Sequence, residues 1–402
     1  MRETVAVSVL PAPNHVATPV GDGWTPAALS RGAVARIDLD ALRSNVARCA
    51  SAAAGADVMA VVKADAYGHG LVACGRAARD GGARWLGVAL LQEAVALRDA
   101  GVDGRILAWL ATPGADWAGC ITRDIDVSVS ASWALDEVRA AAAATGSVAR
   151  VHLKADTGLS RNGATADDWP GLVRAALDAQ ADGLVQVVGL WSHLAIADAP
   201  GHPTIARQLA VFDEALVVAH DAGARPEVRH IANSAATLSL PASHYDLVRP
   251  GIALYGLTPG DDVGTAADLG LRPVMSLRAR LASVKRVAAG SGVSYGHEYT
   301  TATATTLALV PVGYADGLPR AAANAGPVLA AGRVRTVAGR VCMDQVVLDL
   351  GDDTAVPGEE VVLFGADGPS ADDWAAACGT IGYEIVTRIG PRVPRVLVGG
   401  DA

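Results

Sequence analysis

Between residues 33 and about 250, short apolar runs alternate with alanine-rich amphipathic segments, and this alternation is the strongest constraint on the fold. The apolar runs are Val58–Val62, Trp85–Leu90, Ile106–Leu110, Ile125–Val129, Val148–Leu153, Val185–Trp191, Val228–Ile231 and Tyr245–Val248. Helix-like segments lie between them, such as Leu71–Arg79, Leu91–Ala100, Ala134–Ala144, Leu172–Ala179 and Gln208–Ala222. Strands that alternate with helices indicate a parallel sheet. Eight such units in roughly 200 to 250 residues match a (β/α)8 TIM-type barrel. A doubly wound open sheet is the competing architecture.

The pattern changes after about residue 270. Strand-like runs separated by Gly and Pro turns replace the long helical segments, at Leu277–Val287, Leu307–Val312, Val334–Val337, Val346–Leu350 and Glu360–Leu363. This pattern predicts a mainly antiparallel β domain. We therefore expect a probably unstructured, mobile N-terminal extension over residues 1–30, the barrel over 31–270 and the β domain over 271–402.

Composition excludes several classes of protein. Hydrophobic residues make up 51% of the chain and charged residues 19%, which excludes a disordered chain. The net charge of −9 argues against a nucleic-acid binder. No uninterrupted apolar stretch reaches the ~18 residues of a membrane helix, and the N-terminus lacks the pattern of a secretory signal. Five scattered cysteines without a C-x-x-C pair suit a reducing cytoplasm, and argue against disulfides and a zinc site.

Polar clusters follow several of the predicted strands. Lys63 ends the first strand, before a Gly-rich loop, where a barrel places its active site. A lysine there could form a Schiff base with an aldehyde, although a strand-end lysine usually just reaches solvent. Lys154 and Arg161 follow a later strand and form a cationic cluster that suits an anion such as a carboxylate, the alternative being a salt-bridged loop. His193 follows another strand, and we expect no metal site around it because the spacing fits no ligand motif.

The loops after the last two strands favour phosphate binding. Such loops often hold phosphate through backbone N–H groups and a helix start. Ser234 supplies a hydroxyl at a helix start, Gly251 and Ile252 supply N–H groups, and Arg249 lies beside them. Each feature alone is explained by a helix cap or a turn, but together they indicate a site at one end of the barrel.

These residues lie in segments that resemble alanine racemases, the fold type III pyridoxal 5′-phosphate (PLP) enzymes. The resemblance covers about residues 33 to 396, and its most specific segment is V-V-K-A-D-A-Y-G-H-G at residues 61–70. The other segments are H-L-K-A-D-T-G-L-S-R-N-G, A-N-S-A-A, R-P-G-I-A-L-Y-G, V-S-Y-G at Val293–Gly296, V-G-Y-A-D-G at Val312–Gly317 and R-V-C-M-D at Arg340–Asp344.

The resemblance implies a cytoplasmic homodimer, arranged head to tail, that interconverts L-alanine and D-alanine and supplies D-alanine for peptidoglycan. Each active site would combine the barrel of one chain with the β domain of the other. Lys63 matches the lysine that holds PLP as an internal aldimine, and Tyr295 matches a second base contributed by the partner chain. The implied cofactor-binding residues are Lys63, Tyr67, His193, Asn233, Ser234, Arg249, Gly251 and Ile252. Arg249 matches the arginine that meets the pyridine nitrogen, supported by His193.

The resemblance also implies substrate-binding residues. Arg161 matches an arginine near the catalytic tyrosine, the backbone N–H of Met343 would meet the substrate carboxylate, and Tyr314 would line an access corridor. Lys154 matches a lysine that is often carbamylated, which would make it an anion facing Arg161.

The implied chemistry suits these residue types. Two bases on opposite faces can racemise Cα without turning the substrate. Lysine and tyrosine have ordinary pKa values of about 10.4 and about 10, so both pKa values must fall for work at neutral pH. Arginine beside the pyridine nitrogen would leave that nitrogen unprotonated and limit side reactions.

Two positions depart from the family pattern. Pro391 precedes Arg392-Val393-Pro394-Arg395, where the family often has a tyrosine that we expect to touch the PLP phosphate. Gly382 stands before Tyr383-Glu384, where asparagine is frequent. We therefore expect the lost hydroxyl contact to fall to Tyr67 and Ser234.

Three other functions fit parts of the pattern. A racemase for serine or another small amino acid would differ only in pocket shape. A non-catalytic PLP-binding barrel would lack the β domain with its second base. A decarboxylase of the same fold type would need a cysteine-centred substrate motif, whereas Cys342 lies in the racemase-like R-V-C-M-D segment.

Overall fold

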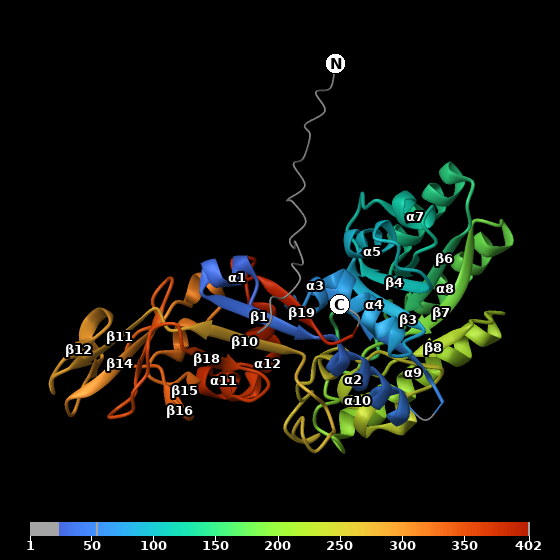
Figure 1. The fold of residues 1–402 in the computed structure, drawn as a ribbon. Helices are drawn as coiled ribbons and strands as arrows, with labels where there is room; N and C mark the ends of the chain where they lie inside the picture. Colours follow the sequence, from blue (N-terminus) through green and yellow to red (C-terminus); the bar gives the residue numbers. More distant parts are fainter. Residues whose placement is uncertain (1–23, 54, 401–402) are drawn as a thin grey trace.

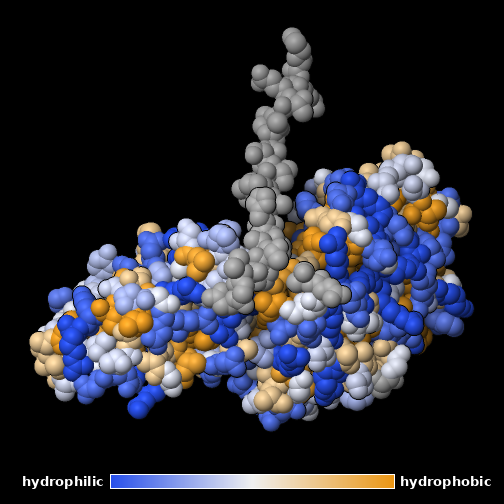
Figure 2. Space-filling view, viewed as in Figure 1, coloured by the Kyte–Doolittle hydropathy of each residue, from blue (hydrophilic) through white to orange (hydrophobic). Residues whose placement is uncertain are grey.

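A computed structural model describes residues 24–53 and 55–400 of the chain. It consists of a barrel and a β domain that lie side by side (Figure 1). On the face shown in Figure 2, hydrophilic residues cover most of the outer barrel. Within the described residues, no helix is long and apolar enough to cross a membrane.

The barrel contains eight parallel strands. They are β2 (Asp57–Val61), β3 (Trp85–Leu90), β4 (Arg105–Leu110), β5 (Asp126–Val129), β6 (Ala149–Lys154), β7 (Val185–Trp191), β8 (Val228–His230) and β9 (Leu247–Val248). The backbone N–H of Asp246 donates to Arg229 O at 3.1 Å, and that of Arg249 donates to Ala232 O at 3.0 Å. These bonds bring the β8 and β9 ends together, so the predicted barrel is confirmed and the open sheet was the wrong alternative.

Helices cover the outside of the barrel, as the Ala-rich periodicity predicted. They are α2 (Leu39–Ala52), α3 (Lys63–Gly68), α4 (Leu71–Asp80), α5 (Leu91–Asp99), α6 (Trp117–Ile121), α7 (Ser132–Thr145), α8 (Trp169–Ala181), α9 (Pro203–Asp221) and α10 (Ser234–Ser239), with short 3-10 turns at Pro241–Ser243 and Ile252–Tyr255. Inside the barrel, Met59, Trp85, Leu107, Val188 and Leu247 form a buried apolar layer.

The second part of the molecule is mainly antiparallel. Its large sheet has the order β16 (Arg333–Thr336), β15 (Pro327–Ala330), β18 (Glu360–Phe364), β10 (Met275–Arg280), β1 (Ala33–Asp38) and β19 (Arg395–Val398). A second sheet has the order β11 (Ser283–Val287), β14 (Thr305–Val310) and β17 (Val346–Asp349). The hairpin β12 (Gly292–Val293) and β13 (Tyr299–Thr300) lies at the end far from the barrel, and α11 (Ala371–Cys378) and α12 (Gly382–Thr387) pack beside each other (Figure 1).

Strand β1 belongs to this second part, although it falls in the range predicted for the barrel. It pairs antiparallel with β10 and parallel with β19. A central strand that is buried on both faces has the same local sequence pattern in either sheet, so the pattern cannot identify its partners. The predicted boundaries at residues 30 and 270 otherwise stay predictions.

The predicted extension is also too long at its end. Trp24 is 1% exposed, and its indole N–H donates to Glu360 Oε2 at 2.8 Å. Thr25 caps α1 (Pro26–Arg31), and the helix ends at Gly32 with φ of 70°. Proline is favoured at the first turn of a helix and glycine just after the last. The remainder of the predicted extension, residues 1–23, lies outside the described residues.

Candidate active site

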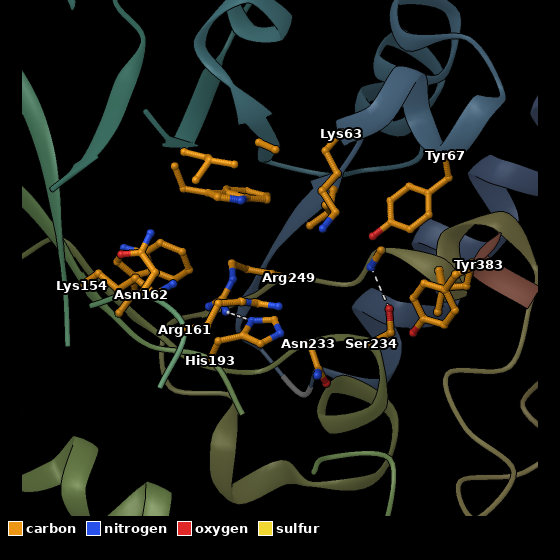
Figure 3. Close-up of a pocket in the computed structure, with 17 residues that line it drawn as sticks. Lys63, Tyr67, Lys154, Arg161, Asn162, His193, Asn233, Ser234, Arg249 and Tyr383 are labelled. Carbon is orange, nitrogen blue, oxygen red and sulfur yellow. Dashed lines mark hydrogen bonds between the residues drawn. The ribbon is translucent and has the colours of Figure 1, made fainter. Parts of the chain in front are cut away.

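A cavity of about 510 Å³ opens at the carboxyl end of the barrel strands. Figure 3 shows Lys63 and Tyr67 reaching in from one side, opposite Arg249, His193 and Asn233. The lining residues are Val61, Lys63, Tyr67, Ala89, Trp109, Leu110, Lys154, Arg161, Asn162, Trp191, His193, Asn233, Ser234, Arg249, Gly251, Ile252 and Tyr383. The structure therefore brings together the ten predicted site residues of the barrel, including all eight predicted cofactor-binding residues.

A left-handed turn places Lys63 at the edge of this cavity. The four residues Ala64–Tyr67 have φ of 54–55° and ψ of 37–53°. For residues with a side chain this conformation costs roughly 1–2 kcal/mol each, so neighbouring groups must hold it. Glu93 is one of them, because its Oε1 accepts the backbone N–H of Ala64 at 2.6 Å. Its Oε2 accepts the N–H groups of Ala89 and Leu90 at 3.0 and 2.9 Å.

Two buried side chains hold the other end of the turn. His69 Nδ1 lies 2.9 Å from both Ala66 O and Tyr67 O, so it carries the proton that these carbonyls accept. Arg395 donates from Nε and NH2 to Gly68 O at 3.1 and 3.0 Å. Since Arg395 lies on β19, the turn is tied to the β domain.

The cavity is cationic. Lys63, Lys154, Arg161 and Arg249 line it, and none of the described lining residues is Asp or Glu. Burial, followed by the charge of Arg161, lowers the pKa of Lys63, while Glu93 opposes the shift. Burial together with Arg249 and Arg161 lowers the pKa of Lys154 to about 7. A site with these charges suits an anionic ligand, and both amines lose their protons more readily than in water.

Arg249 is fixed on the floor of the cavity. Its NH2 donates to Ser192 O at 2.8 Å, to Ile231 O at 3.2 Å and to His193 Nδ1 at 3.1 Å. A guanidinium group only donates, so His193 accepts through Nδ1 and is neutral. Burial, followed by the charge of Arg249, also holds the pKa of His193 well below its ordinary value. Within the described residues nothing accepts from Arg249 Nε, which leaves that donor for a ligand.

The other end of the cavity carries hydroxyl groups. Ser234 Oγ accepts the backbone N–H of Gly251 at 2.7 Å (Figure 3). A Cβ on Gly251 would lie 2.3 Å from Tyr67 Oη, so glycine is required here. Asn233 lines the cavity, but its Oδ1 accepts the N–H of Ala236 and caps α10. Ile252 begins the 3-10 turn that follows Gly251.

Tyr383 is a functional candidate that the sequence reasoning missed. It lines the cavity, and its ring centroid lies 6.3 Å from that of Tyr67. The expectation that Pro391 leaves this end short of a hydroxyl was therefore wrong, because Tyr383 on α12 supplies one. A tyrosine beside a helix start gave the only available sequence signal. Trp109, Asn162, Trp191 and Leu110 were also missed, and all follow or end barrel strands where a signal was available.

Three predicted site residues do not reach this cavity. Tyr295, Met343 and Tyr314 are 71%, 53% and 40% exposed, and all three lie on the β domain. They lie on one group of loops, since Ser294 Oγ donates to Arg340 O at 2.8 Å and Ala315 N–H donates to Met343 O at 2.9 Å. The structure therefore separates Tyr295 from Lys63 within one chain.

Comparison with known proteins fits this division into two parts. The family model "Alanine racemase, N-terminal domain" matches residues 37–259, and "Alanine racemase, C-terminal domain" matches residues 274–397. The chain belongs to the alanine racemase family. The alanine racemase of Streptomyces coelicolor is 60% identical over 372 residues, which cover 90% of this chain and 95% of the relative. That of Frankia casuarinae is 57% identical over 374 residues, covering 92% and 97%.

Solved alanine racemases share the fold. The crystal structure from a D-cycloserine-producing Streptomyces lavendulae has a TM-score of 0.91 and 59% identity, and covers 92% of this chain and 97% of that one. The crystal structure from Bacillus anthracis with bound L-Ala-P has a TM-score of 0.83 and 32% identity, covering 92% and 96%.

Proposed function

We propose that the protein is a PLP-dependent alanine racemase that interconverts L-alanine and D-alanine. The observation that carries this proposal is the position of Lys63 in a cationic cavity without a carboxylate among its described lining residues. PLP has an anionic phosphate and an aldehyde, so it needs both the positive charge and a lysine that can give up its proton. Membership of the alanine racemase family identifies the amino acid as alanine.

The residues at the two ends of the cavity fit PLP. Ser234, Gly251, Tyr67 and Tyr383 supply hydroxyl and backbone groups around a space that a Cβ on Gly251 would occupy. Arg249 supplies Nε–H at the other end, where a pyridine nitrogen needs a donor. When bound, PLP withdraws electrons from an attached amino acid and makes its Cα proton acidic.

Lys63 is the base on one face of the substrate. Burial and the nearby charge of Arg161 lower the pKa of its amine, so a larger fraction is neutral near pH 7. The left-handed turn and Glu93 hold the lysine backbone, so that the amine remains in the cavity while it takes or returns a proton. Lys63 Nζ lies 6.0 Å from the ring centroid of Tyr67, which closes one side of its path.

Tyr295 of the partner chain is the base on the other face. Its exposure and its place on the far loops of the β domain support a head-to-tail homodimer in which each β domain completes the partner's cavity. The neighbouring loop residues Met343 and Tyr314 would arrive with it, one to meet the substrate carboxylate through its N–H and one to line the access path. Arg161 already lines the cavity and would stabilise the phenolate of Tyr295.

Lys154 is carbamylated in the active protein. With a pKa of about 7, its amine is partly neutral and can attack CO₂, which forms a carbamate and releases one proton. The resulting anion would lie among Arg249 and Arg161, the two charges that now lower its pKa. Carbamylation would therefore convert a repulsive contact into an attractive one and orient Arg161.

A cytoplasmic location and a role in D-alanine supply for peptidoglycan complete the proposal. All five cysteines are free, and three of them are buried, which fits a reducing compartment. The product is the D-enantiomer of a common amino acid, a class of compound that peptidoglycan synthesis consumes.

The test is exchange of the Cα proton in heavy water, with purified protein and PLP and with each enantiomer of alanine in turn. The proposal expects the opposite enantiomer to form with deuterium at Cα. Lys63→Ala should abolish exchange, while Tyr295→Phe should retain PLP and lose most proton abstraction from L-alanine.

Other outcomes identify the alternatives. Faster exchange of serine than of alanine would show a racemase for another small amino acid. Bound PLP without exchange of either enantiomer would show a PLP-binding protein, and Tyr295 would then have a structural role. A fully active Tyr295→Phe enzyme in both directions would disprove the two-base scheme.

A further inference from the structure

Four polar side chains form one hydrogen-bonded chain through the interior of the barrel. Arg249 NH1 lies 2.9 Å from His230 Nδ1. His230 Nε2 lies 3.0 Å from His152 Nδ1, and His152 Nε2 lies 3.2 Å from Asp126 Oδ2. The first three of these side chains counted from Asp126 are fully buried at 0% exposure, and Arg249 is 5% exposed.

This chain connects the two ends of the barrel. Asp126 is the first residue of β5, at the end opposite the cavity, where Arg150 Nε donates to its Oδ1 at 2.9 Å and Arg105 lies 3.6 Å from its Oδ2. Arg249 follows β9 on the floor of the cavity. Burial raises the pKa of Asp126, while His152 and Arg105 oppose that shift.

The surrounding residues leave room for the two imidazole rings. A Cβ on Gly189 of β7 would lie 2.1 Å from His152 Nδ1, so only glycine fits beside that ring. The indole of Trp191 stacks on His230 with centroids 5.5 Å apart and planes 13° apart, and Trp85 meets His152 edge-on at 5.4 Å. The rings are therefore held in place from several strands.

The ends of the chain fix the direction of every hydrogen bond. Arg249 can only donate, so His230 Nδ1 accepts and the ring proton lies on Nε2. That proton is donated to His152 Nδ1, so His152 also carries its proton on Nε2 and donates it to Asp126. Both histidines are thus neutral and in the same tautomer. Burial, followed by the charge of Arg249, holds the pKa of His230 well below its ordinary value, in agreement with this assignment.

We propose that Asp126, through His152 and His230, is a positioning residue that keeps an acceptor facing Arg249 NH1 and so aims the remaining guanidinium donor at the ligand. This inference rests on the proposed function, because the ligand it concerns is PLP. Without the carboxylate, the two rings are free to reverse. A proton on His230 Nδ1 would then face Arg249, and two donors cannot share that 2.9 Å contact.

Asp126→Asn tests the direction of the chain. Asparagine has one oxygen, and the charged donor Arg150 competes for it with His152. When Arg150 takes the oxygen, the amide NH₂ faces His152 and reverses both histidines. The matched control is Glu227→Gln, because Glu227 also pairs with Arg105 and Arg150 but does not touch either ring of the chain.

Two readouts are measured on the PLP-loaded protein with ¹⁵N-labelled histidine. The ¹⁵N shifts of the nine histidines report which ring nitrogen carries the proton. We expect the Nε2–H tautomer for His152 and His230 in the wild type and in Glu227→Gln, and the Nδ1–H tautomer in Asp126→Asn. We also expect Asp126→Asn to bind PLP at least tenfold more weakly and to change the visible absorption of bound PLP, whereas Glu227→Gln should do neither.

A second variant covers the case in which Asp126→Asn does not fold. His152→Leu keeps the site apolar and uncharged but removes the acceptor for His230 Nε2–H, and we expect a similar loss of PLP affinity. A proton on His230 Nδ1 in the wild type, or a folded His152→Leu or Asp126→Asn protein with unchanged PLP affinity, would overturn the proposal. Failure to racemise alanine with these tautomers and affinities intact would instead count against the proposed function alone.

Discussion

The carboxylate of Glu93 accepts the backbone N–H of Ala64 at 2.6 Å, one residue beyond Lys63. Glu93 therefore joins the start of α5 to the left-handed turn that presents the lysine. The turn is costly by itself, and Glu93 binds an N–H that has no partner inside such a turn. This contact links the stability of the turn to the position of the amine.

Replacing Glu93 with alanine should reduce both stability and activity. We expect a loss of about 1–2 kcal/mol in the free energy of unfolding, typical of a removed helix cap, and a fall in kcat of at least tenfold. Denaturant unfolding and initial racemisation rates measure the two effects.

The matched control is Glu137→Ala. Glu137 Oε1 accepts the N–H of Gly114 at 3.0 Å, and its Oε2 accepts the indole N–H of Trp117, but it does not contact the Lys63 turn. It should lose similar stability and keep its kcat. Equal effects of the two variants on kcat would contradict a specific role for Glu93.

Mixed dimers should recover activity from two inactive variants. In a dimer of one Lys63→Ala chain and one Tyr295→Phe chain, one site keeps both bases and the other has neither. Random pairing of equal amounts should give about a quarter of wild-type activity, since half of the dimers are mixed and each has one working site of two. Refolding or co-expression followed by a racemisation assay measures this, and an inactive mixture would mean that both bases come from the same chain.

Gly251→Ala should weaken PLP binding at the phosphate end. The new Cβ would lie 2.3 Å from Tyr67 Oη, so the phenol must move away from the cavity. We expect a cost of about 1–3 kcal/mol, as for other overpacked sites, which should appear as weaker PLP binding in equilibrium dialysis. Gly171→Ala on α8 is the control, because a Cβ there meets nothing within 4 Å. Equal PLP affinity in both variants would show that the Tyr67 hydroxyl is not needed.

His69 should make the protein less stable in acid. Burial lowers the pKa of His69 to about 3 from an ordinary 6.5. Between these values the unfolded chain binds a proton that the folded chain does not, so stability is constant above pH 6.5 and falls as the pH drops toward 3. The full window corresponds to an effect on the order of 4–5 kcal/mol.

His69→Gln should flatten this dependence, because glutamine can donate to the same carbonyls without titrating. Unfolding free energies from pH 7 to pH 4 measure the slope. His220→Gln, at an exposed position in the last turn of α9, should leave the slope unchanged. A His69→Gln slope equal to that of wild type would assign the acid sensitivity to other groups.

Lys154 should carry a carbamate above neutral pH. With a pKa of about 7, its amine is mostly protonated below that pH and mostly neutral above it, so the carbamate should form as the pH rises and be lost as it falls. ¹³C NMR with labelled bicarbonate is well suited to the test, because the chain has only three lysines. The carbamate signal should disappear in Lys154→Gln and persist in Lys285→Gln, and a signal that survives Lys154→Gln would disprove the assignment.

Much of the barrel was predictable from local sequence. The runs Trp85–Leu90 and Val185–Trp191 coincide with β3 and β7, because buried parallel strands are continuous apolar segments bounded by helices. The barrel part of the site was predictable for a related reason, since polar residues that follow parallel strands meet at one end of the barrel.

Other features were not readable from sequence. β1 joins the second sheet, and residues 24–30 pack against it, because the partners of a buried strand depend on contacts far along the chain. Tyr383 reaches the cavity from a helix more than a hundred residues beyond the last barrel strand. Glu93 and His69 act on a turn whose left-handed conformation no local propensity would favour.

The sequence by itself determined which residue types stand at the ends of the strands, and hence the cationic cavity with Lys63, because strand periodicity and chain order are local properties. Only the tertiary structure decided how those residues are held. The turn after Lys63, the direction of the Arg249–His230–His152–Asp126 chain and the distance of Tyr295 from Lys63 all depend on contacts between segments remote in sequence. Hydrogen-bond direction and burial are properties of those contacts, and they exist only once the chain has folded.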